Sequence, residues 1–91
     1  HDEQLAILHE LISDAQFDIE ALVRDLGRLQ KTLDVLQVKI LAFEHANAAV
    51  PEHLTAARQE AQSAFAQKQT ELEERRRTVD IYEDYRDSLL A

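Results

Sequence analysis

The chain has 91 residues, which limits it to one domain, and its eighteen acidic and ten basic residues give a net charge of −8. One glycine and one proline exclude the many chain reversals of a β-sandwich or barrel, and the acidic balance argues against nucleic acid or anionic lipid as partner. The absence of cysteine excludes disulfides, thiolate nucleophiles and zinc ribbons.

An apolar residue recurs at alternating spacings of three and four along the first half of the chain. Such a pattern fills the a and d positions of six consecutive heptads and predicts one long helix, from about residue 3 to 46, packed along another helix. The residues of this seam are Leu5, Leu8, Ile12, Ala15, Ile19, Leu22, Leu26, Leu29, Leu33, Leu36, Ile40 and Phe43. Gly27 lies off the seam, where a local bend or close packing is expected rather than a break.

The break is predicted at residues 47–50. Asn47 tolerates the left-handed backbone that ends helices, and Pro51 suits the first residue of a new helix. A short connection between two long helices folds them back antiparallel. The second helix is expected from residue 51 to about 90, with a weaker seam that four long cations interrupt: Arg58, Lys68, Arg75 and Arg86.

The predicted fold is therefore all-α: a long, coiled-coil-like antiparallel helical hairpin that forms a single domain over residues 1–91. Twelve of the eighteen residues from 33 to 50 are apolar, more than one neighbouring helix can cover. We expect two hairpins to meet at their turn-proximal halves as a four-helix bundle, with a different helical protein or an isolated hairpin as the alternatives. The predicted contact residues are Val35, Val38, Leu41, Ala42, Ala57 and Ala64.

Two clusters of side chains are candidate binding sites. Arg75, Arg76 and Arg77 form the one basic cluster, but Glu71, Glu73 and Asp80 stand at the spacing of helical salt links, which favours a solvated face over phosphate binding. His45 and His53 flank the turn beside glutamates, a combination that can bind zinc or nickel, although they lack the i, i+4 spacing of one helix. Surface histidines are the preferred interpretation, so no metal or other cofactor is assigned.

No catalytic residues are predicted either. The carboxylate pairs lie on exposed helix faces, and no serine–histidine–acid set, glycine-rich phosphate loop or Glu-x-x-His motif occurs. Ile81 and Tyr85, with Leu89 and Leu90, are an alternative interaction patch near the chain termini.

The function expected from the sequence is a non-enzymatic protein–protein interaction module whose partner is itself or another helical protein, with no nucleic acid and no membrane insertion. One alternative is a ligand- or metal-sensing helical domain of a larger protein, membrane-anchored or not, and another is an adaptor or chaperone that binds a partner's helix. Because the chain starts at His1 and lacks methionine, we expect a processed end or a fragment. The compartment stays open, with the cytoplasm slightly favoured over a periplasmic fragment.

Overall fold

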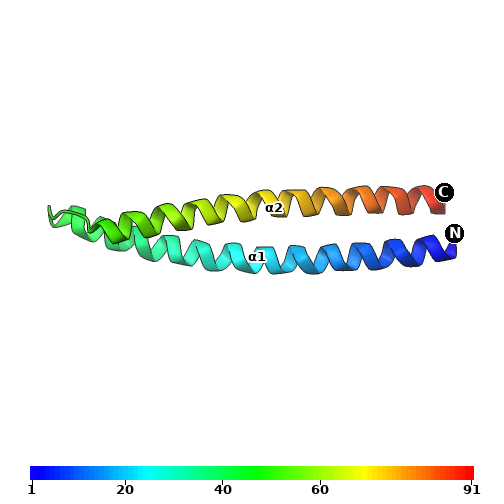
Figure 1. Ribbon diagram of the computed structural model, residues 1–91, viewed down its shortest axis with the longest axis horizontal. Coiled ribbons are helices and arrows are strands. Elements are labelled where there is room, and N and C mark those ends of the chain that lie inside the picture. Colours follow the sequence, from blue (N-terminus) through cyan, green and yellow to red (C-terminus); the bar gives the residue numbers. More distant parts are fainter.

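A computed structural model describes all residues, 1–91, as two long helices that run antiparallel (Figure 1). Helix α1 spans Asp2–His45 and helix α2 spans Glu52–Leu90. The molecule measures 67 × 16 × 14 Å, and both chain termini lie at the end opposite the turn. The all-helical hairpin predicted from the heptad pattern is confirmed.

The turn owes its shape to Asn47, whose φ of 53° places it in the left-handed region. The amide of Asn47 donates to the carbonyl of Glu44 at 3.0 Å, and the amide of Ala48 donates to that of Phe43 at 2.9 Å. These two bonds form a Schellman motif, which satisfies carbonyls that the end of α1 would otherwise leave unpaired. Asparagine is one of the few residues besides glycine that fills this position at low cost.

Pro51 precedes α2 instead of forming its first residue. Its ψ of 136° is extended, so it acts as the cap residue and Glu52 begins the helix. Proline fits there because its fixed φ, here −57°, suits the cap and it has no amide hydrogen that would need a partner. The helix thus begins one residue later than the sequence suggested, and the acid Glu52 occupies its first turn.

The predicted seam forms the core between the helices. Most α1 seam positions are buried or half-buried, and the apolar α2 seam positions face them. One cluster near the turn joins Leu36 and Ile40 to Leu54 and Ala61, and another near the termini joins Ile12 and Ala15 to Val79. Three of the four seam cations are half-buried, as expected for side chains that lay their methylenes over the core.

Phe43 is the exception in α1, with 36% of its surface exposed. It lies beyond the point where α2 begins, so no helix faces it. At Gly27, α1 continues without a break, as expected. No atom lies within 4 Å of the position that a β-carbon would occupy, so close packing does not explain the glycine.

Candidate interaction surface

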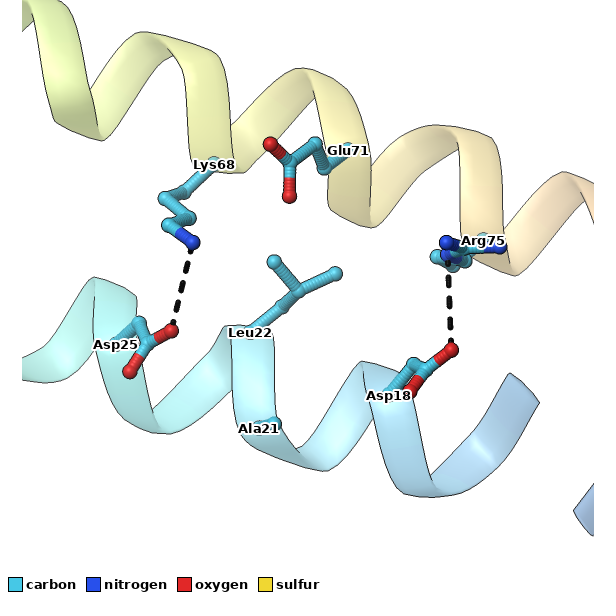
Figure 2. Close-up of a pocket in the computed structure, with 7 residues that line it drawn as sticks. All are labelled: Asp18, Ala21, Leu22, Asp25, Lys68, Glu71 and Arg75. Carbon is cyan, nitrogen blue, oxygen red and sulfur yellow. Dashed lines mark ion pairs between the residues drawn. The ribbon is translucent and has the colours of Figure 1, made fainter. Parts of the chain in front are cut away.

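Midway along the hairpin, an open groove of about 250 Å³ runs between the helices. Asp18 and Asp25 line it from α1, and Lys68, Glu71 and Arg75 line it from α2. Figure 2 shows Leu22 pointing toward α2 between the two ion pairs, with Glu71 projecting from α2 into the same space. We call this side of the hairpin the groove side.

Two ion pairs cross the groove and show the register of the helices. The Asp25 carboxylate lies 3.6 Å from the Lys68 ammonium, and the Asp18 carboxylate lies 3.9 Å from the Arg75 guanidinium. From Asp18 to Asp25 is seven residues forward in α1, and from Arg75 to Lys68 is seven residues back in α2. The same rule gives the level of any other residue of the hairpin. The groove carries three acids and two bases, so both cations are already matched by acids of the same chain.

Closer to the turn, the same side of the hairpin becomes apolar. A second open groove is lined by Leu29 and Thr32 of α1 and by Ala57, Ala61 and Ala64 of α2, with Glu60 at its edge. Val35, fourteen residues after the groove residue Ala21, follows on the same side because a seven-residue spacing returns to the same face of a paired helix. We define the turn patch as Thr32, Val35, Ala57 and Ala64.

The six predicted contact residues lie on three different sides of the hairpin's surface. Ala57 and Ala64 are half-buried beside the seam, and Ala57 packs on the core cluster near the turn. Val35 and Ala42 are exposed on α1 within about 20° of one another around the helix. Val38 is turned roughly 60° from Val35, and Leu41 roughly 120°, both away from the groove side.

Three of these residues are large and half or more exposed: Val35 at 53%, Val38 at 67% and Leu41 at 50%. Val35 and Val38 line a shallow, almost wholly apolar depression with the stems of Asp34 and Lys39. Ala42, Phe43, Ala46 and Ala48 line another at the end of α1. The turn-proximal half therefore exposes apolar surface on the back of α1 as well as on the groove side.

The basic cluster is dispersed rather than joined into one site. Arg75 pairs with Asp18 of the other helix instead of Glu71, and none of the three predicted links within α2 is formed. Arg76 and Arg77 are exposed. No ion pair within the chain involves either of them.

His45 and His53 are both exposed at the turn. No group of three or more histidine, aspartate or glutamate side chains is placed to hold a metal ion. Neither helix has a stretch that is long and apolar enough to span a bilayer.

Sequence reasoning overlooked two apolar residues at the other end of α1. Ile7 and Leu11 are 53% and 39% exposed, at the level of α2 that carries Ile81 and Tyr85. Their signal is the seven-residue spacing: Leu11 precedes Asp18 by one heptad, and Ile7 precedes Ala21 by two. The seam pattern alone does not identify Ile7 and Leu11, because both residues flank the seam.

Comparison of the chain with protein-family models, with curated proteins and with solved structures finds no match.

Proposed function

We propose that the chain is a non-enzymatic helical interaction module that homodimerises through its turn-proximal apolar half. The observation that carries the proposal is the exposure of Val35, at 53%, beside the small residues Ala57 and Ala64, in a hairpin that buries only 10 of its 91 residues. Each Å² of apolar surface removed from water contributes about 25 cal/mol. A second hairpin packed on this surface would therefore bury apolar area that the single chain leaves in water.

A second copy suits the turn patch because the patch is complementary to itself. Its bulky member, Val35, is on α1, and its small members, Ala57 and Ala64, are on α2 at neighbouring levels. A two-fold axis that places α1 of one copy on α2 of the other sets the bulky side chain against the small ones twice. Large-against-small contacts of this kind allow helices to interdigitate without voids.

An enzymatic role has less support. The charged groove is open, and the four charges that cross it are joined in pairs, so they lack the contrasting, sheltered environments of acid–base catalysts. What the hairpin offers to a partner is apolar surface on which to pack.

The test compares two valine-to-glutamate variants. Val35→Glu places a carboxylate in the proposed contact, whereas Val23→Glu makes the same change at a valine of similar exposure, 47%, outside the turn patch. Light scattering across a concentration series should show a dimer for the unmodified chain and for Val23→Glu, and a monomer for Val35→Glu.

Circular dichroism checks that both variants remain helical. A dimer that survives Val35→Glu would show that the contact lies elsewhere. An unmodified chain that stays monomeric at all concentrations would overturn the proposal and favour the adaptor function, in which a partner's helix covers the same surface.

A further inference from the structure

The end of the hairpin that carries the termini has an apolar patch of its own. Ile81 and Tyr85 of α2 are 60% and 50% exposed. Tyr85 follows the groove residue Glu71 by two heptads, and Leu11 precedes the groove residue Asp18 by one, so both lie on the groove side. We define the terminal patch as Ile7, Leu11, Ile81 and Tyr85.

The terminal patch and the turn patch thus share one side of the hairpin and flank the charged groove. The opposite side is polar over most of its length, which makes the difference between the sides large. Its residues beside the seam are His9, Gln16, Val23, Gln30, Gln37 and Glu44 on α1, with Thr55, Gln62, Gln69, Arg76, Glu83 and Leu90 on α2. Val23 and Leu90 are the exposed apolar members of this series, and they lie far apart along the hairpin.

We infer that a second copy of this chain covers the whole groove side, with the two hairpins parallel, turn beside turn, and α1 of each copy on α2 of the other. The inference rests on the proposed homodimer and extends it: the terminal patch is a second contact site, and its occupant is the terminal patch of the second copy. The four helices then form a bundle along the full length of the hairpin.

The register of the two helices, which the ion pairs show, favours this orientation. Leu11 lies one heptad before Asp18, and Tyr82 lies one heptad after Arg75, so Leu11 and Tyr82 are at the same level of the hairpin. Ile81 is the neighbour of Tyr82 in α2. In the parallel dimer, Leu11 therefore meets Ile81 of the second copy, Ile7 meets Tyr85, and Val35 meets Ala57. Apolar groups face apolar groups at both ends, and the acids Asp18 and Glu74 approach one another in the middle.

The antiparallel alternative matches the surfaces less well. With α1 on α1, α2 on α2 and the two charged grooves superposed, it would place Glu60 of one copy near Tyr85 of the other, and it would bring Asp18 near Asp25 and Glu71 near Glu74. Like charges set opposite one another across an interface oppose association. Its one electrostatic gain, Asp14 opposite Arg28, is an exposed pair of the kind that contributes little.

The size of the surface also favours a contact along the full side. The molecule is 67 Å long and no more than 16 Å wide, so one side spans at most 67 by 16 Å. Its projection is roughly 1,100 Å², against about 800 Å² per partner in a standard stable interface. The turn-proximal half alone provides about half of the projection, which falls below that standard. A contact that includes the terminal patch therefore reaches the standard size, which a turn-proximal contact alone does not.

Because the chain contains no cysteine, single cysteines report the orientation directly. Leu11→Cys chains mixed with Ile81→Cys chains should form a disulfide-linked heterodimer on mild oxidation, and neither variant should cross-link by itself. Leu11→Cys mixed with Thr32→Cys reports the antiparallel dimer, and His9→Cys mixed with Ile81→Cys is the control from the polar side.

Light scattering on the same samples separates the inference from the proposed function. A dimer in which Leu11→Cys couples to Ile81→Cys supports both. A dimer that couples Leu11→Cys to Thr32→Cys, or that couples neither pair, overturns the inference and leaves the homodimer standing. A monomer in every sample overturns both. In the unmodified background, Ile81→Glu should weaken the dimer by about tenfold or more, because it introduces a charge into an apolar contact.

Discussion

The guanidinium of Arg75 lies 3.9 Å from the Asp18 carboxylate, so an ion pair occupies a level of the α2 seam where an apolar residue would otherwise stand. Both side chains are about half exposed, at 53% and 51%. At this level, α2 therefore contacts α1 through an ion pair at the surface. Leu72, three residues earlier, is instead buried against α1. The two kinds of contact differ widely in their expected contribution to stability.

We therefore expect Arg75→Ala to change the free energy of unfolding by no more than about 1 kcal/mol, since exposed ion pairs contribute little. Leu72→Ala should cost about 2–4 kcal/mol, because it removes buried methyl groups from the only core that the hairpin has. Urea denaturation of both variants at one protein concentration measures the difference. Equal costs would mean that the ion pair is far more sheltered than its exposure indicates.

Gly27 offers a stabilising substitution. A β-carbon at this position meets open space, and the residue lies inside a helix, where alanine is favoured over glycine by about 1 kcal/mol. Gly27→Ala should raise the free energy of unfolding by about that amount. The matched control is the reverse change at an exposed position of α2, Ala66→Gly, which should lower it by a similar amount. A loss of stability in Gly27→Ala would indicate that the flexibility of this turn of α1 is needed.

Asn47 tests the turn. Its φ of 53° suits glycine and asparagine but not a β-branched residue. Asn47→Gly should leave stability within about 0.5 kcal/mol of the unmodified chain, whereas Asn47→Val should cost about 1–3 kcal/mol through backbone strain. Thermal unfolding followed by circular dichroism separates the two. If valine were accepted as readily as glycine, the left-handed geometry at Asn47 would be wrong.

The hairpin itself could be predicted because its determinants are local in sequence. The spacing of residues such as Leu8 and Ile12 sets the face that must be buried, and Asn47 with Pro51 marks the reversal whichever partner the chain has. Phe43 shows where such reasoning ends. Its position in the heptad is correct for burial, but burial also requires a facing helix, and α2 begins too late to supply one.

The candidate interaction surface was only partly predictable for a related reason. Which side of α1 a residue occupies follows from its spacing, but which residues of α2 share that side depends on the register of the two helices. The sequence predicts Leu41 and Ala57 as contacts of one face, but the helical spacing turns Leu41 away from the groove side on which Ala57 lies. Conversely, Ile7 joins Tyr85 in the terminal patch only in the register that the Asp18–Arg75 pair shows.

The overall length of the dimer should be measurable by small-angle X-ray scattering. Hairpins that lie side by side along their full length keep the 67 Å extent of one chain. Hairpins that overlap only in their turn-proximal halves would reach roughly 100 Å, since half of each would project beyond the other. We expect the maximum dimension of the dimer to stay near the shorter value. Comparison with the Val35→Glu variant supplies the scattering curve of the single hairpin.

Salt should strengthen the dimer. Each chain carries a formal net charge of −8, and the parallel arrangement brings Asp18 of one copy near Glu74 of the other, so two acidic surfaces must approach. Raising the ionic strength from about 0.01 M to about 0.15 M shortens the screening length from about 30 Å to about 8 Å, which weakens that repulsion. The dissociation constant from sedimentation equilibrium should therefore fall over this range.

Two charge variants test the cause of this salt dependence. Glu74→Gln should lower the dissociation constant at low salt and make it depend less on salt. Glu83→Gln, on the polar side, removes the same charge away from the contact and should have a smaller effect. A dissociation constant that rises with salt would instead mean that attraction between opposite charges holds the copies together, and the apolar patches would lose their role as the main contact.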